Sequence, residues 1–256
     1  MMSHSSCHPC CWCDIRKDNL NKKGVQRTIG SLMTLFWEFF ESRSTKEDAK
    51  NYGNVIHPPM INNDENDQTP VIHLLPPPEL HLMTGPVNTM FNGLDSIWDD
   101  SEVWLKSCNV KKTDYHGGQF TGNDCRKLLK NVAKIPNPTG MVKNYADAFT
   151  AFNDVVSSCY GDELQGDYVS MISSFATAYN RLGINITPKV HAVVFHVAEF
   201  CSFTGRGLAP WSEQTGEALH HDFAKTWENF FVRDMENPVY ADHLLRAVCS
   251  YNGQHV

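Results

Sequence analysis

The chain has 256 residues, 41% of them apolar, which is enough to build the core of one large domain or two small ones. It contains no run of about eighteen apolar residues, and its first residues lack the basic and apolar regions of a signal peptide, so we expect neither a membrane span nor secretion. We therefore expect an intracellular, reducing compartment. The formal net charge of -7 argues against a protein whose whole surface coats nucleic acid.

Four of the nine cysteines lie between Cys7 and Cys13, and in a reducing compartment such a cluster indicates metal ligands rather than disulfides. Cys10 and Cys13 are separated by two residues, a spacing that lets two thiolates from one tight turn reach a single zinc ion. Cys7 and Cys10 form an overlapping alternative pair. We expect neither Cys7 nor Cys11 to be a ligand, since Cys11 adjoins Cys10 and neighbouring side chains rarely share one tetrahedral ion.

The next segments change character twice. Residues 26–43 are apolar on nearly every side, which predicts a helix enclosed by others. Residues 51–78 are rich in proline, asparagine and acidic residues without periodicity, which predicts an exposed loop. We accordingly expect three regions: a cysteine-rich half-site with a buried helix (1–50), the loop (51–78) and a helical domain (79–256).

Periodic apolar residues predict further helices beginning at Glu79, over 145–159 and over 172–182, and a last short helix from Pro238. A glycine-rich turn over 115–123 leads into a basic helix. No segment predicts a strand, and no internal repeat is present. The sequence thus predicts a mainly α fold.

Residues 106–143 carry eight basic and two acidic side chains, a local charge of +6 on an acidic chain. Such a segment can contact the phosphates of DNA, although a solvated helix face is the commoner meaning of this pattern. The candidate DNA contacts are Arg126, Lys127, Lys130 and Lys134.

A helix beginning at Thr187-Pro188 and ending at Gly205 carries His191 and His196. Histidines three to five residues apart commonly ligate one zinc ion, so they would complete the four-ligand site begun by the cysteine pair. Positions five apart differ by about 140° on a regular α-helix. The pair therefore requires a distorted turn or long reach from both rings.

Ser212 and Glu213 follow, where a serine N-cap and a carboxylate suit the start of another helix. Glu213, Glu217, His220 and His221 are three to four residues apart, a spacing used in di-metal sites. Such a site needs a second copy on another helix, and the sequence has none. A stand-alone metallo-hydrolase is therefore the least favoured interpretation.

Several short motifs resemble, in their order along the chain, the catalytic core of the V(D)J recombinase subunit, the recombination-activating protein, and its transposon relatives. They are Cys10-Cys11-Trp12-Cys13-Asp14, Leu80-His81 ahead of Gly85, Thr121-Gly122-Asn123, Arg126-Lys127-Leu128, His191 and His196, and Leu208-Ala209-Pro210-Trp211-Ser212-Glu213. The cysteine and histidine set and the run around Glu213 are the most specific of these.

That family uses a ribonuclease-H-like sheet whose three carboxylates hold two divalent metals, with an all-helical zinc-binding insertion before the third carboxylate. The resemblance implies that Cys10, Cys13, His191 and His196 bind a structural zinc ion and that Glu213 is the third carboxylate. The family's two aspartates lie upstream of the cysteine pair, where this sequence has only nine residues. The chain thus resembles the insertion and last helix of a core whose sheet is missing.

The resemblance therefore implies a transposon-derived, DNA-associated, nuclear fragment that is catalytically incomplete. A single carboxylate cannot hold a pair of Mg²⁺ or Mn²⁺ ions, so metal-dependent cleavage requires that the missing carboxylates come from elsewhere, such as a second chain. The expected partners are duplex DNA and that second chain. A non-enzymatic, zinc-stabilised protein-interaction module remains the alternative.

Overall fold

The computed structural model describes residues 6–60, 64–113, 119–212 and 214–254, and across them it contains helices and no named strand. The backbone of this described part pairs at two isolated bridges, Cys13 with Gln26 and Thr28 with Pro70. The predicted mainly α fold is confirmed. No helix in the described part is both long enough and apolar enough to cross a lipid bilayer.

The chain forms two compact units, Met1–Trp211 and Ser212–Val256. The α-helices of the first unit are α1 (Ile29–Glu41), α2 (Val71–Leu74), α3 (Glu79–Asp95), α4 (Ser101–Ser107), α5 (Gly122–Lys130), α6 (Gly140–Cys159), α7 (Tyr168–Asn180), α8 (Pro188–Phe195) and α9 (Val197–Thr204). In the described residues this unit also contains the short 3-10 helices η1 (Lys17–Asn19), η2 (Lys46–Tyr52), η4 (Val132–Lys134) and η5 (Ala209–Trp211). The expected division at residues 50 and 78 stays a prediction.

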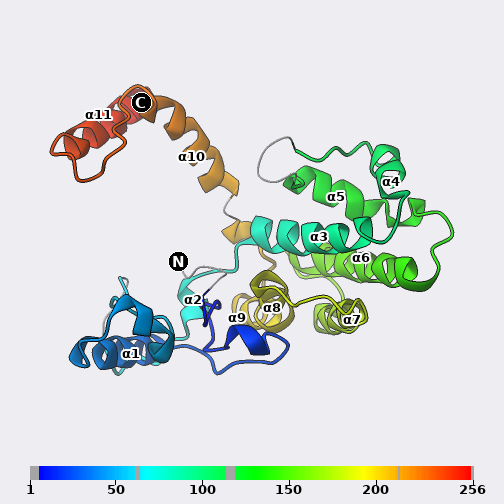
Figure 1. The fold of residues 1–256 in the computed structure, drawn as a ribbon, viewed down its shortest axis with the longest axis horizontal. Coiled ribbons are helices and arrows are strands. Elements are labelled where there is room, and N and C mark those ends of the chain that lie inside the picture. The colour runs from blue at the N-terminus through cyan, green and yellow to red at the C-terminus, as the bar shows by residue number, and fades with distance from the viewer. Residues whose placement is uncertain (1–5, 61–63, 114–118, 213, 255–256) are drawn as a thin grey trace. The chain divides into compact units, whose positions relative to one another are not determined.

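The core of the first unit is built around α3 and α6, which lie side by side in Figure 1. α6 packs along α7, and α3 also contacts α5 and α8. The apolar stripe predicted for α6 is buried, and Ala148, Phe149 and Cys159 are fully so. Contacts with α3 and α7 position α8, and with it one half of the histidine and cysteine cluster.

The helix α1 differs from its prediction. Thr28 caps it through a reciprocal pair of hydrogen bonds with Ser31, but only Ile29, Gly30 and Met33 are buried. The side chain of Phe40 is 62% exposed and that of Trp37 38% exposed. In Figure 1 α1 lies apart from α3 to α7. The expected enclosure was wrong, because an apolar sequence does not itself supply the neighbouring helices that would cover it.

The segment predicted as an exposed loop, 51–78, is partly structured. η2 extends into its beginning, and near its end α2 buries Val71 and Ile72. The amide of Val71 donates to the carbonyl of Arg27 at 2.9 Å. The prediction of an exposed loop is therefore wrong at α2, where two apolar residues are held against the cysteine-rich N-terminal region.

The second unit consists of α10 (Gln214–Trp227) and α11 (Tyr240–Gln254), which pack on each other. Ring contacts join them, with centroids 5.6 Å apart for Phe223 and Tyr251 and 5.7 Å apart for Trp227 and Tyr240. Ala247 is fully buried in this pair. The last helix predicted from Pro238 is present, and at 15 residues it is longer than expected.

Candidate metal centre

The structure brings Cys10, Cys13, His191 and His196 together in the first unit. Their four ligand atoms all lie within 4.8 Å of one another, and all four residues are buried. The Sγ atom of Cys10 is 3.3 Å from Nε2 of His196, and Sγ of Cys13 is 3.3 Å from Nε2 of His191. In a tetrahedral zinc site sulfur and nitrogen ligands stand about 3.6 Å apart, so this cluster has the size and chemistry to hold a metal ion.

The cysteine half of the cluster lies in a turn that is hydrogen-bonded to residues 25–27. The amide of Asp14 donates to the carbonyl of Val25 at 3.0 Å, and the amide of Arg27 donates to the carbonyl of Trp12 at 2.9 Å. Gly24 stands so close to this turn that a Cβ atom there would be 2.9 Å from Sγ of Cys13. The position therefore requires glycine for space.

A buried guanidinium ties this turn to the segment after α1. Arg27 is 2% exposed; its Nε donates to the carbonyl of Cys13 at 2.9 Å, and its Nη2 donates to the carbonyl of Gly53 at 2.8 Å. Burial lowers its pKa, while Cys10 and Cys13 are the main groups that oppose this effect. A positive charge beside two thiol groups favours their ionised, metal-binding form.

The histidine half comes from a broken helix. The hydroxyl of Thr187 accepts from the amide of Val190 and caps α8, as the sequence predicted. His196 has φ -120° and ψ -27°, and it separates α8 from α9. This distortion removes the angular separation that a regular helix would impose on His191 and His196, and both Nε2 atoms can then face the cysteines.

The two histidines differ in what their other ring nitrogen contacts. Nδ1 of His191 lies 2.9 Å from the carbonyl of Leu20, so it carries the proton and leaves Nε2 to accept a metal. Nδ1 of His196 faces Oε2 of Glu199 at 3.8 Å, longer than a hydrogen bond. The ring of Trp12, 5.4 Å from that of His196, covers the site from one side.

The two thiols differ in acidity. A hydrogen bond from Cys10, together with bonds from His191 and His196, lowers the pKa of Cys13 to about 2 against the opposing effect of burial. The same bond to Cys13, burial and the neighbouring thiols raise the pKa of Cys10. The two thiols therefore share one hydrogen bond, and binding of a metal ion to both sulfurs would release a proton from the pair.

Among the residues that the structure describes, the cluster contains neither Cys7 nor Cys11. Both are partly exposed, and burial of its sulfur raises the pKa of Cys11 to about 12, so this thiol stays protonated. The cluster thus supplies four buried protein ligands. A closed site of this kind is typical of structural metals, because a catalytic site keeps a position open for water or substrate.

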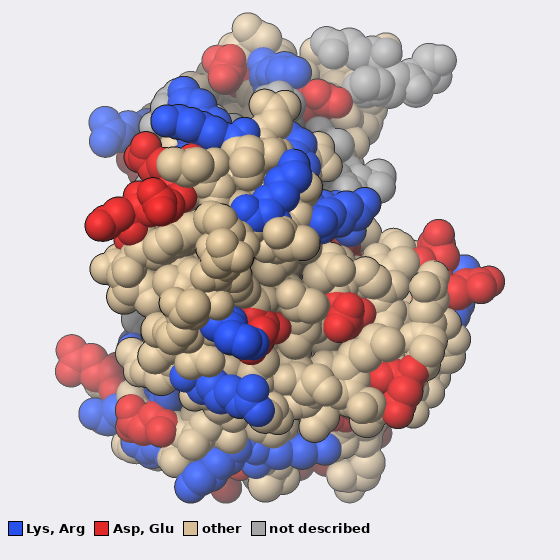
Figure 2. Space-filling view, turned by 90° about the vertical axis from the view of Figure 1, so that its right-hand side faces the viewer, with Lys and Arg blue, Asp and Glu red and all other residues tan. Residues whose placement is uncertain are grey.

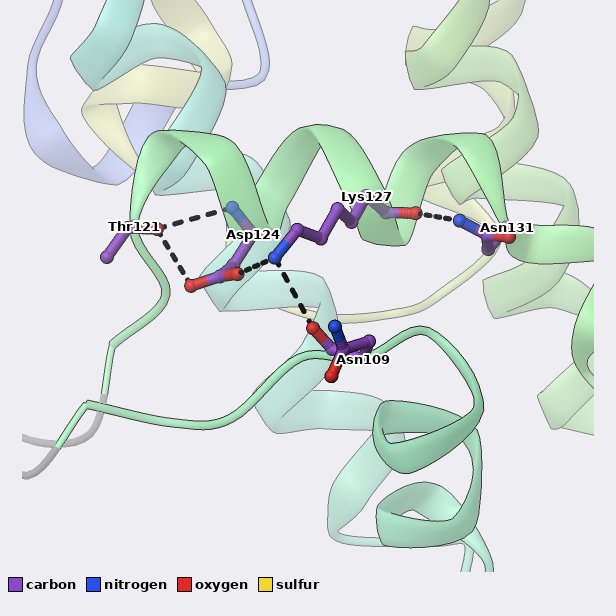
Figure 3. Close-up of polar contacts among 5 residues, drawn as sticks. All are labelled: Asn109, Thr121, Asp124, Lys127 and Asn131. Atoms are coloured by element: carbon purple, nitrogen blue, oxygen red, sulfur yellow. Dashed lines mark hydrogen bonds and ion pairs between the residues drawn. The ribbon is translucent and has the colours of Figure 1, made fainter.

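The candidate DNA contacts are not equivalent in the structure. Arg126 forms an ion pair with the buried carboxylate of Glu79. The ammonium of Lys127 lies 3.0 Å from Oδ1 of Asp124 and 3.3 Å from the carbonyl of Asn109, as Figure 3 shows. The ammonium of Lys134 donates to a backbone carbonyl at 2.8 Å. These three cations hold α5 and η4 in place.

Carboxylates outside the 106–143 segment reduce its local charge. Asp95 pairs with Lys112, Glu79 with Arg126 and Asp147 with Lys143. Figure 2 shows blue basic and red acidic side chains interspersed on the face it presents. These ion pairs offset part of the positive charge of the segment.

Glu213 lies outside the described residues, as do the side chains of Glu217 and His221. His220 is exposed on α10. Because Glu213 is not described, its assignment as a third carboxylate stays a prediction.

Sequence reasoning missed three groups that support the cluster: the guanidinium of Arg27, the carbonyl of Leu20 and the carboxylate of Glu199. The carbonyl has no sequence signal, because every residue carries one. Arg27 could have been noticed as a basic residue one position before the cap of an apolar helix, and Glu199 as an acid three residues after a ligand histidine. Neither pattern is specific.

No family model and no curated protein matches this chain.

Proposed function

We propose that the protein is a zinc-stabilised helical module derived from a DNA transposase or recombinase, DNA-associated and catalytically incomplete. The observation that carries the proposal is the Cys10, Cys13, His191 and His196 cluster. Two sulfur and two nitrogen ligands in tetrahedral reach favour zinc over magnesium, calcium or manganese, which prefer oxygen. The metal would join the N-terminal turn to the α8–α9 break and supply folding energy.

The family assignment is supported by the order of motifs along the chain. The ligand pair near the N-terminus, the pair in a late helix and the Trp211-Ser212-Glu213 run occur in the order of the recombination-activating protein and its transposon relatives. The same assignment implies a nuclear location and contact with duplex DNA.

Metal analysis tests the zinc-binding part of the proposal. Protein purified without added metal should contain about one zinc ion per chain, and chelation should lower its melting temperature. Fluorescence anisotropy with a labelled duplex tests the DNA-binding part. An affinity that falls steeply between about 50 and 200 mM salt supports phosphate contacts. A chain with zinc but no salt-dependent DNA binding contradicts the DNA-associated assignment.

One observation favours the alternative of a protein-interaction module. On α1 the rings of Phe36, Trp37 and Phe40 form an aromatic group, with centroids 5.1 to 5.9 Å apart, and two of them are substantially exposed. Aromatic side chains are enriched in the cores of protein interfaces. Trp37→Ser with Phe40→Ser should leave zinc content and DNA affinity unchanged, and loss of a protein partner through this change alone would favour the alternative.

A further inference from the structure

A pocket of about 320 Å³ lies between α5 and α6, away from the metal cluster. Its lining comes from two facing helices and the turn after α6: Arg126, Leu129, Lys130, Asn153, Val156, Ser157, Tyr160 and Gly161. None of these eight residues is acidic. The pocket therefore has two cationic side chains in its wall and no carboxylate.

The polar side chains of the pocket stand in two matched rows. Arg126 and Lys130 are four residues apart on α5, and Asn153 and Ser157 are four residues apart on α6. Residues at this spacing share one face of a helix. The pair on α5 and the pair on α6 therefore line the pocket from opposite sides, together with the apolar side chains of Leu129 and Val156.

These donors are available to a ligand. The side chains of Lys130, Asn153 and Ser157 form no hydrogen bond or ion pair in the described part of the chain. Arg126 is held by the buried carboxylate of Glu79, and a guanidinium has five N–H donors, so this ion pair orients it without exhausting it. A pre-oriented arginine loses little entropy when it binds an anion.

The buried wall contains a further donor. Tyr160 is 3% exposed, and its hydroxyl has no hydrogen-bond partner within the described residues. An unpaired buried hydroxyl costs free energy. The nearby carbonyls of Cys159 and Gly161 already accept from the amides of Leu208 and Ala209.

We propose that the pocket between α5 and α6 binds a phosphate group through Arg126, Lys130, Asn153 and Ser157. Phosphate presents several acceptor oxygens and a charge that both cations complement. Its source would be either the backbone of DNA or a free nucleotide, with Leu129 and Val156 beside the sugar. As a DNA site it deepens the proposed function, and as a nucleotide site it stands independently.

The direct test titrates ¹⁵N-labelled protein with inorganic phosphate and with adenosine monophosphate, and follows the amides of Ser157 and Gly161 by NMR. In the wild-type protein, the amide signals of Ser157 and Gly161 should both show saturable shifts with either ligand. Lys130→Gln and Ser157→Ala should each weaken binding at least fivefold. Lys143→Gln removes an exposed lysine paired with Asp147 elsewhere on α6 and should change nothing. Absence of saturable shifts, or equal weakening by the control, overturns the proposal.

Duplex DNA distinguishes the two sources and separates this proposal from the general one. Weakening of DNA and nucleotide binding together by Lys130→Gln supports a DNA-backbone site. Loss of nucleotide binding alone supports a free-nucleotide site. Phosphate binding by a wild-type chain that does not bind duplex DNA supports the pocket while contradicting the DNA-associated function. Duplex binding that persists when neither phosphate nor nucleotide binds overturns the pocket alone.

Discussion

The Sγ atom of Cys13 lies 3.3 Å from Nε2 of His191, although 178 residues separate them along the chain. The contact joins a turn near the N-terminus to a helix held by α3 and α7. Such a contact cannot arise from local structure. The cluster can therefore form only when the N-terminal turn and α8 have both taken their places in the folded first unit.

Replacing Cys13 with serine should remove the bound metal. A hydroxyl is a poor zinc ligand, and loss of a structural metal is among the changes that exceed about 4 kcal/mol. In a chain of this size that corresponds to a fall in melting temperature of roughly 8–16 °C. Cys11→Ser is the matched control and should retain both zinc content and melting temperature. Elemental analysis and calorimetry measure the two quantities, and equal behaviour of the variants would contradict the ligand assignment.

Gly24→Ala should weaken metal binding without removing a ligand. The added Cβ would stand 2.9 Å from both Sγ of Cys13 and the backbone nitrogen of Ile15, so the turn would have to shift. Overpacking of this kind costs about 1–3 kcal/mol. Competition with a zinc chelator should show a lower affinity. Gly253→Ala, where the added atom meets nothing within 4 Å, is the control. Unchanged affinity in Gly24→Ala would show that the turn has room.

Arg27→Met should destabilise the first unit by about 2–4 kcal/mol, since it leaves the carbonyls of Cys13 and Gly53 without their charged donor. Arg27→Lys should recover only part of this, because a single ammonium cannot match a planar fork that reaches two carbonyls. Urea unfolding measures both. Arg16→Met, at an exposed position in the same turn region, should lie near wild type. Full recovery by lysine would show that only the charge matters.

Asp95→Asn should lower stability at neutral pH and make little difference in acid. Hydrogen bonds from Lys112 and then Ser101 lower the pKa of Asp95 in the folded chain. The ionised carboxylate therefore stabilises the fold fully above its unfolded pKa of about 4, and this contribution is lost as the pH falls through the lower folded value. Its side chain is 33% exposed, so the effect is at most about 1 kcal/mol. A difference from wild type that does not shrink as the pH falls below about 4 would contradict this cause.

The isolated chain should neither nick nor join DNA in Mg²⁺ or Mn²⁺. Glu213 can give one ion at most two of about six oxygens, and a two-metal reaction clamps the attacking and leaving oxygens from both sides. Supercoiled and hairpin DNA are the substrates, and Glu213→Gln is the matched variant. Nicking by wild type that disappears in Glu213→Gln would mean that other carboxylates complete the site.

The sequence predicted the elements whose signal is local. The cap at Thr187, the helices over α6 and α7, and the metal-ligand types at Cys10 and Cys13 all follow from spacing over a few residues. The pairing of cysteines with histidines was also predicted, because each pair alone is half of a tetrahedral site.

Features that depend on distant neighbours could not be predicted. Within the described residues of the first unit no helix covers Trp37 and Phe40 of α1, and the residues of α1 do not encode this exposure. The break at His196 was anticipated only as a geometric need, since no proline or glycine marks it. The polar row of Asn153 and Ser157 reads as a solvated helix face until α5 is placed opposite it.

The long separation of Cys10 and His196 along the chain also has a kinetic consequence. Closing a loop of nearly two hundred residues costs about 5 kcal/mol of chain entropy. We therefore expect the metal cluster to form after the helices between its ligand residues have docked. Interactions absent from the folding transition state act on the unfolding rate. Metal bound at His191 and His196 would thus act mainly on the unfolding rate. Zinc should slow unfolding in denaturant many-fold and leave the refolding rate of the helices nearly unaltered.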